Sequence, residues 1–146
     1  LDMDFLINNS LAGKSINKQI EQKNQNNIKT FKKKEQDLKK EETKLITQKK
    51  ITDKDEYEKK IIIFRNKVID LKKLGIKKAN SLKKEKLEAK ASLFDSITPI
   101  IVDYAKENSA SIIFDKKNIV LGKSELDITK DILKILNAKI KNIKLN

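Results

Sequence analysis

Between residues 29 and 90 the chain has no proline, a single glycine (Gly75) and 22 Lys and Arg against 11 Asp and Glu. This segment carries nearly all of the net charge of +13 in a chain of 146 residues. A stretch this charged cannot bury most of its surface, and straight-chain residues such as Lys and Glu favour helices. It predicts long, solvated helices in an elongated molecule, because too little apolar material remains for a thick globular core.

The composition also excludes several kinds of chemistry. The chain has no His and no Cys, which removes thiolate zinc sites, His or Cys nucleophiles and disulfides. Residues 12–15 carry the end of a phosphate-binding loop motif, but Asn8 stands where the motif needs its first glycine, so Gly13 marks a bend between helices instead. Carboxylate pairs such as Glu41 and Glu42 lie among lysines, without the apolar pocket that acid–base catalysis needs. We expect a chain that is not an enzyme and uses no metal or cofactor.

Apolar residues recur at helical intervals on both sides of a break near Ile51. Before the break they are seven residues apart from Phe31 through Leu38 to Leu45. After it they step by four, three, four and three residues, in a register formed by Tyr57, Ile61, Phe64, Val68 and Leu71. Such spacing indicates two helices that pack along one narrow seam.

The start of the second helix is marked by Thr52 with Asp55 three residues later, a pattern similar to a capping box. The connection between the two helices is short, so they should run antiparallel. We therefore expect a long antiparallel helical hairpin, a coiled-coil tentacle, over residues 11–90 with its tip near residues 50–54.

The N-terminus predicts the end of a strand, because Leu1, Met3 and Phe5 alternate with aspartates. Asp4 would then cap the helix that follows. Pro99 lies inside a broad apolar stripe. It either kinks the helix and acts as a hinge, or begins a new helix at its first position.

The C-terminal third predicts a β-hairpin and a helix. Asn108 and Ser109 suit a left-handed helix stop, and residues 111–114 and 119–122 indicate two short strands. Asp127 caps a helix whose apolar face extends to Ile140. Residues 1–10 and 91–140 would form an oligomerisation body, and residues 141–146 a frayed tail. So few strands cannot stand alone in water. The predicted class is therefore α+β, with a small β-body completed by joining strands of several chains.

Several segments resemble the OmpH/Skp family of periplasmic chaperones. Residues 99–108, 111–122 and 126–133 are similar to the C-terminal signature of the family in order and spacing. Residues 2–3, 9–10, 12–14 and 51–61 resemble its strand end, first helix and arm tip. The resemblance covers essentially the whole chain.

The resemblance implies a homotrimer in which a β-body holds three helical tentacles around a cavity. The cavity would hold unfolded outer-membrane proteins without ATP and prevent their aggregation. It also implies a periplasmic location, although the sequence itself has no signal-peptide pattern. An anionic membrane surface or lipopolysaccharide is a further candidate partner, but the lipopolysaccharide site of some members matches no residues here. The trimer contacts would involve Leu1, Met3, Ile112, Phe114, Ile119 and Leu121.

For the mechanism, we expect basic arms to attract acidic unfolded chains and to screen their apolar strands from each other. The candidate client contacts are Ile62, Ile63, Ile69, Lys59, Lys60, Lys72 and Lys73. The isoleucines could equally pack against the first helix.

Two other functions stay open on the sequence alone. A basic coiled coil could bind nucleic acid or anionic lipid, though every basic residue except Arg65 is Lys, and base readout prefers Arg. We therefore expect no sequence-specific nucleic-acid binding. The hairpin could also be a purely structural spacer.

Overall fold

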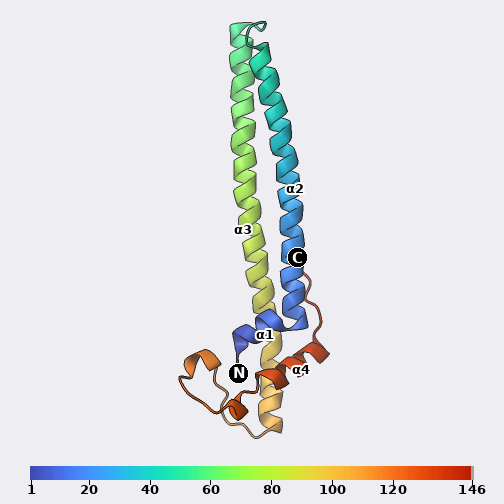
Figure 1. The fold of residues 1–146 in the computed structure, drawn as a ribbon, viewed down its shortest axis with the longest axis vertical. Coiled ribbons are helices and arrows are strands. Elements are labelled where there is room, and N and C mark those ends of the chain that lie inside the picture. Colours follow the sequence, from blue (N-terminus) through green and yellow to red (C-terminus); the bar gives the residue numbers. More distant parts are fainter. Residues whose placement is uncertain (146) are drawn as a thin grey trace. The chain divides into compact units, whose positions relative to one another are not determined.

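The structure is a computed structural model and describes residues 1–145. Four α-helices account for most of it (Figure 1). They are α1 (Met3–Asn9), α2 (Leu11–Gln48), α3 (Lys54–Glu107) and α4 (Thr129–Lys139), with two short 3₁₀ helices, η1 (Lys116–Asn118) and η2 (Ser124–Leu126), between α3 and α4. None of these helices is long and apolar enough to cross a membrane, as far as the described residues go.

The predicted α+β class with a β-body is wrong, because residues 1–145 contain helices and loops but no strand. Residues 111–114 and 119–122 are irregular, and η1 lies where the β-turn was expected. A strand exists only when a neighbouring strand takes up its N–H and C=O groups. No second strand lies beside either segment within the described residues, so β-branched residues alone do not make a sheet.

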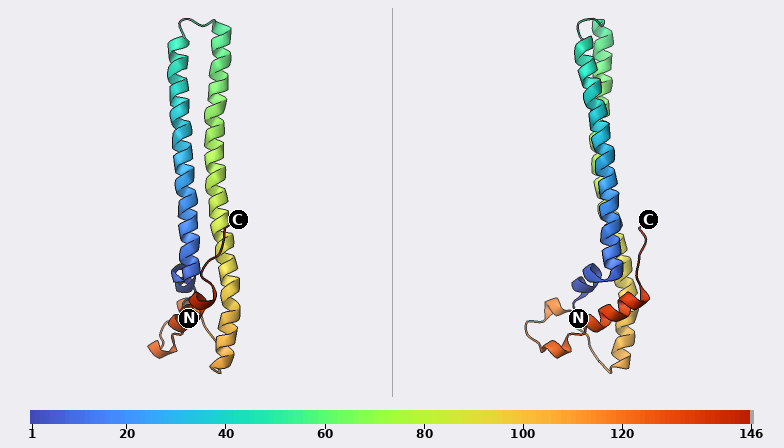
Figure 2. Two further views of the ribbon diagram at one scale, coloured as in Figure 1. Left: turned by 90° about the vertical axis from the view of Figure 1, so that its right-hand side faces the viewer. Right: turned by 45° about the vertical axis from the view of Figure 1, so that its right-hand side comes forward.

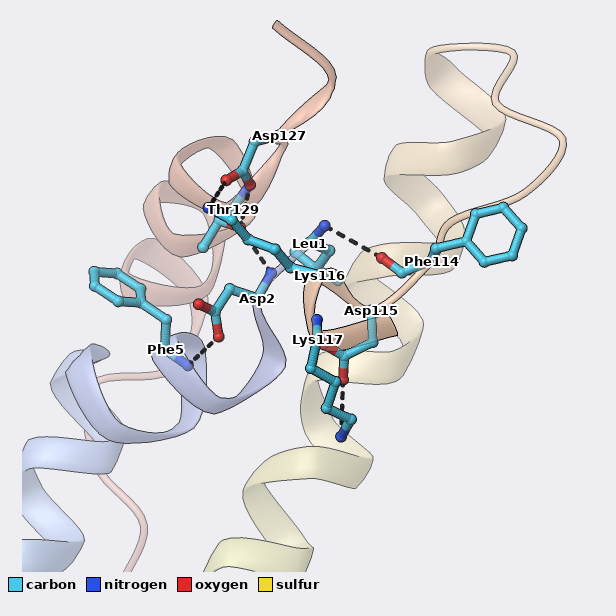
Figure 3. Close-up of polar contacts among 9 residues, drawn as sticks. All are labelled: Leu1, Asp2, Phe5, Phe114, Asp115, Lys116, Lys117, Asp127 and Thr129. Carbon is cyan, nitrogen blue, oxygen red and sulfur yellow. Dashed lines mark hydrogen bonds and ion pairs between the residues drawn. The ribbon is translucent and has the colours of Figure 1, made fainter. Parts of the chain in front are cut away.

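The predicted N-terminal strand is also wrong, since residues 3–9 form α1. Asp2, and not Asp4, caps this helix: its carboxylate accepts a hydrogen bond from the N–H of Phe5 at 2.8 Å (Figure 3). Only Leu1 keeps strand-like bonds. Its amino group donates to the carbonyl of Phe114 at 3.3 Å, and its own carbonyl accepts from the N–H of Lys116 at 2.8 Å.

The described chain divides into two compact units, and α2 and α3 contribute to both. The first unit contains residues 1–21 and the described part of the chain from Lys84 onward. Its core is apolar. The large apolar side chains that are fully buried are Leu6, Ile16, Leu93, Ile97, Ile132 and Leu136. The helices α1, α3 and α4 and the first two turns of α2 therefore share one core without a sheet.

The start of α2 shows how this core is locked. Ser10 is fully buried and its hydroxyl accepts a hydrogen bond from the N–H of Gly13 at 3.1 Å. Asn137 of α4 accepts a second one from the N–H of Leu11 at 2.7 Å. The first N–H groups of a helix have no acceptor within the helix. Here those of Leu11 and Gly13 find one, and the acceptor for Leu11 lies 126 residues away in the sequence. Gly13 lies inside α2, so the bend is at Ser10 and not at the glycine.

The second unit, residues 22–83, is the outer part of the helical hairpin. In it α2 and α3 run side by side and antiparallel, and residues 49–53 join them (Figure 2). Leu45 is buried, while the remaining seam residues are half-buried apart from Val68, which is 43% exposed. Asp53, and not Thr52, caps α3, because its carboxylate accepts from the N–H groups of Asp55 and Glu56.

The helix α3 continues through Pro99. The predicted restart at this residue is therefore wrong, and whether Pro99 acts as a hinge stays a prediction. The helix ends as expected with a left-handed residue: Ser109 has φ of 53°, and the N–H of Ala110 reaches back to the carbonyl of Ala105 at 2.9 Å.

Beyond α4, the predicted frayed tail is wrong over its described residues. Ile143 and Leu145 pack against the core of the first unit, and hydrogen bonds tie them to α2. Asn146 lies outside the described residues.

Candidate functional site

A groove of about 910 Å³ runs along one side of the hairpin in the second unit. Its lining includes the half-buried seam residues Phe31, Leu38, Phe64 and Leu71, together with Val68. Because two helices alone cannot cover both flanks of their seam, this apolar surface stays accessible. The exposure of these apolar residues therefore follows from the sparse seam, while the depth of the groove depends on the spacing of the helices.

Gly75 forms part of the groove lining opposite Phe31. A Cβ at Gly75 would lie 3.8 Å from Cε1 of the Phe31 ring, at ordinary van der Waals distance. The lack of a side chain on α3 here leaves the edge of the ring open to the groove.

Beside the groove, α3 presents a stripe of three isoleucines. Ile62, Ile69 and Ile76 are seven residues apart and are 57%, 48% and 57% exposed. Seven residues are close to two helical turns, so the three side chains lie nearly in line along the helix. Ile69 also lines the groove. We call these three residues the isoleucine stripe.

Cationic side chains lie along both margins of the isoleucine stripe. Arg65 and Lys72 are on the margin towards the groove and line it. Lys59 and Lys73 follow on the other margin at helical spacing and are exposed. The acidic lining residues, Glu35 and Glu42, belong to α2. The α3 side of the groove is therefore apolar and positively charged.

The other flank of the hairpin is different. It has a smaller hollow of about 340 Å³ lined mainly by charged residues of both signs. There Lys67 of α3 donates to the carboxylate of Glu41 of α2 at 2.7 Å. This ion pair links the two helices across their seam, so the charges on this flank are partly matched within the chain.

The structure brings only part of the predicted client-contact set together. Ile62 and Ile69 are exposed in the stripe, so the alternative that they pack against the first helix is wrong. Ile63 is also exposed, but it lies about 100° around the helix from Ile62. Lys60 forms an ion pair with Glu56 at 2.7 Å within α3.

Sequence reasoning missed Ile76 and the contribution of Arg65 to this surface. Ile76 could have been found from its spacing of seven residues to Ile69. Arg65 could have been found from its position between two members of the stripe. The groove itself could not, because its depth depends on how far apart the two helices lie.

The charge of the second unit reinforces this surface. Residues 22–83 contain 20 Lys and Arg against nine Asp and Glu, a net charge of +11 out of the +13 of the chain. The first unit is close to neutral by comparison. Within the described residues no group of acidic side chains could hold a metal ion. The exposed isoleucines and the net positive charge suit the hairpin to apolar contact and to the attraction of anions.

The predicted trimer residues fall into two groups, all in the first unit. Leu1 is buried and Met3 packs against the core of its own chain. In the loop before α4, in contrast, Ile112 is 69% exposed, Leu121 is 91% exposed, and Phe114 and Ile119 are exposed too. A hollow of about 440 Å³ opens beside Ile119 and Leu121.

An ion pair fixes the loop that carries these residues. Lys116 donates to Asp127 at 2.7 Å, and the Asp127 carboxylate also accepts from the N–H of Thr129 at 3.1 Å and from its hydroxyl (Figure 3). The Thr129 hydroxyl in turn accepts from the N–H of Asp2 at 2.8 Å. The hydrogen bond from Lys116, followed by those from Thr129, holds the pKa of Asp127 well below its ordinary value of 3.8. The N-cap position of α4, which begins at Thr129, is occupied by Ile128 and not by Asp127 as predicted, although the Asp127 carboxylate does accept from the first N–H of the helix.

The sequence and the fold of this chain are both similar to those of known proteins. The family model described as outer membrane protein (OmpH-like) matches residues 1–136. A crystal structure of an OmpH-like protein from Caulobacter crescentus CB15, named as a candidate outer membrane chaperone, superposes with a TM-score of 0.92. The two chains share 18% sequence identity, and the match covers 97% of this chain and 83% of the other. A search of curated proteins gives no match.

Proposed function

Because this chain belongs to the OmpH-like family, whose chaperones are not enzymes and are typically periplasmic, we propose that it is an ATP-independent periplasmic holdase for unfolded outer-membrane proteins. Membership confirms the prediction that the chain is not an enzyme. The observation that carries the proposal is the isoleucine stripe beside an open apolar groove on a hairpin with a net charge of +11.

Each contact in this mechanism is weak by itself. Fully burying an Ile side chain is worth about 1.5–3 kcal/mol. The isoleucines of the stripe are about half exposed, so a client that covered one of them would gain roughly 1 kcal/mol. Several such contacts, added to charge attraction within a Debye length of about 8 Å, hold an unfolded chain without trapping it. A holdase without ATP needs this kind of reversible binding.

Self-association into a homotrimer is part of the proposal. The exposed loop residues Ile112, Phe114, Ile119 and Leu121 support it, because a second copy would remove this apolar surface from water. Several hairpins in one particle would also multiply the weak client contacts.

The first test removes the stripe. Ile62→Ser with Ile69→Ser should weaken binding of an unfolded outer-membrane β-barrel protein about 10- to 30-fold, since two contacts of roughly 1 kcal/mol are lost. The matched control is Ile46→Ser with Ile51→Ser, two residues that are 65% and 83% exposed but lie outside the stripe and the groove. Equal losses in both pairs would contradict a role of the stripe.

The second test separates local charge from total charge. Lys59, Lys72 and Lys73 are changed to Gln in one variant, and the exposed residues Lys106, Lys130 and Lys134 of the first unit in the other. Both variants lose the same charge, but only the first should weaken client binding. Similar weakening in both would indicate a general attraction of polyanions, as expected of a nucleic-acid- or anionic-lipid-binding coiled coil. Vesicles with lipopolysaccharide or anionic lipid, and duplex DNA, serve as competitors in the same titration.

A further inference from the structure

The segment after α4 occupies a site of its own at the base of the hairpin, within the first unit. Residues 142–145 leave α4 and run alongside α2 and α3 (Figure 2). Here the side-chain amide of Gln19 holds the backbone at two points. Its Nε2 donates to the carbonyl of Ile143 at 2.8 Å, and its Oε1 accepts from the N–H of Leu145 at 3.3 Å.

These two bonds reproduce the contact that a neighbouring β-strand would make. The amide donates to the carbonyl of one residue and accepts from the N–H two residues later, as a residue of a neighbouring strand does. These bonds involve only the backbone and do not depend on the side chain between them. Ser15 extends the contact, because its hydroxyl donates to the side-chain carbonyl of Asn142 at 3.0 Å. The site therefore recognises an extended backbone.

The side chains of the segment follow a two-residue alternation. Ile143 and Leu145 are half-buried and pack against the core of the first unit, whereas Lys144 between them is exposed. Ile143 and Lys144 border a hollow of about 200 Å³ whose other lining residues are Glu85, Glu88, Ala89 and Ser92 of α3. Apolar residues at alternate positions meet the protein, and the charged one is turned to the surface.

We infer that Gln19, with the apolar surface beside it, is a binding site for strand-forming peptide segments of alternating apolar and polar residues, and that residues 142–145 occupy it as an internal ligand. Strands of outer-membrane β-barrels have this alternation, so segments of the clients compete for the same place. The inference rests on the proposed function for the identity of the competitor, but not for the existence of the site.

The tether through α4 favours occupation of the site by residues 142–145. A segment joined to its site through α4 acts at an effective concentration in the millimolar range. A free peptide at micromolar concentration cannot displace it, whereas a client held by the hairpin reaches a comparable local concentration. The segment thus keeps the site covered until a client is bound elsewhere on the same molecule.

The test measures peptide binding to a chain that ends at Lys141. The probes are a fluorescent peptide of residues 141–146, a designed peptide of alternating Ile, Lys and Leu, and a shuffled peptide of the same composition with its apolar residues adjacent. The shortened chain should bind the first two at least tenfold more tightly than the full chain and more tightly than the shuffled peptide. In the shortened chain, Gln19→Ala should reduce binding of the first two peptides to the level of the shuffled peptide. Gln22→Ala, which changes an exposed Gln on the same helix, should leave their binding unchanged. If only the peptide of residues 141–146 bound, the inference would be overturned, because the site would then accept this chain's own segment and no other. If neither that peptide nor the alternating peptide bound, the inference would be overturned as well.

A measurement on the full chain guards against misfolding of the shortened one. Gln19→Ala should release the segment and speed amide hydrogen exchange at Leu145, whose N–H loses its acceptor, at least tenfold over the Gln22→Ala control. Unchanged exchange would contradict the clamp. Failure of the chaperone proposal would instead show as unchanged aggregation of a client while peptide binding persists.

Discussion

Two glycines in α2 and α3 should respond in opposite directions to the same substitution. Replacing a glycine by alanine inside a helix gains about 1 kcal/mol from backbone propensity alone. At Gly75 the new Cβ meets Phe31 at 3.8 Å, an ordinary contact. We therefore expect Gly75→Ala to stabilise the protein by about 0.5–1 kcal/mol, which raises the melting temperature by about 1.5–3 °C in a chain of this size.

At Gly13 the geometry reverses the sign. A Cβ there would lie far inside the van der Waals distance of the Ile7 carbonyl oxygen and 2.8 Å from the carbonyl carbon. Carbon and oxygen atoms in the closest favourable contacts are about 3.3–3.6 Å apart. The end of α1 would have to move by about an ångström, and such overpacking costs about 1–3 kcal/mol. Gly13→Ala should therefore destabilise the protein despite the gain in helix propensity.

The assay is urea unfolding followed by far-ultraviolet circular dichroism, together with a thermal scan of each variant. Amide hydrogen exchange then assigns the effect to the outer hairpin for Gly75 and to the first unit for Gly13. Destabilisation by Gly75→Ala would mean that the groove does not leave the Phe31 edge open. A neutral or stabilising Gly13→Ala would refute the close approach of α1 and α2.

Three further predictions concern stability and binding. Ser109→Gly should stabilise the protein by about 1 kcal/mol in urea unfolding, because Ser109 has φ of 53°, a conformation that only glycine adopts without strain; an unchanged midpoint would contradict the left-handed stop. The hydrogen bonds from Lys116 and Thr129 lower the pKa of Asp127. They should therefore stabilise the folded protein fully above the ordinary pKa of 3.8 and progressively less as the pH falls below it. In melting temperatures measured against pH, Asp127→Asn should flatten this decline. Client affinity should fall as salt rises from low to physiological concentration and then level off on the apolar contacts; independence of salt would argue against any role of the +11 on the hairpin.

Much of the hairpin could be predicted from the sequence, because an apolar repeat of seven residues over several turns is typical of helices that pack along a seam. Phe31, Leu38 and Leu45 lie in the seam for this reason, and Ser109 terminates α3 as local chemistry requires. Short patterns were less reliable. The alternation of Leu1, Met3 and Phe5 covers too few residues to distinguish a strand from a helical turn, and capping by Asp2 favours the helix.

The contacts that join distant parts of the chain could not be predicted at all. Nothing local marks Asn137 as the acceptor for the first N–H of α2, or Gln19 as the clamp on Ile143. Both depend on where α4 packs, which depends on the complete core. The strand prediction at residues 112–113 was wrong because β-branched residues carry only a local preference, and a preference becomes a strand only beside a partner.

In the proposed function, the hairpin holds unfolded outer-membrane proteins through its isoleucine stripe and positive charge. The most direct measurement dilutes a urea-unfolded outer-membrane β-barrel protein into ATP-free buffer with three chains of this protein per client, and follows light scattering and the mass of the soluble complex. Wild-type protein should suppress the scattering and give a soluble complex of three chains with one client, and the Ile62→Ser, Ile69→Ser variant should bind the client about 10- to 30-fold more weakly. Scattering that is unchanged by the folded wild-type protein would contradict the proposed function.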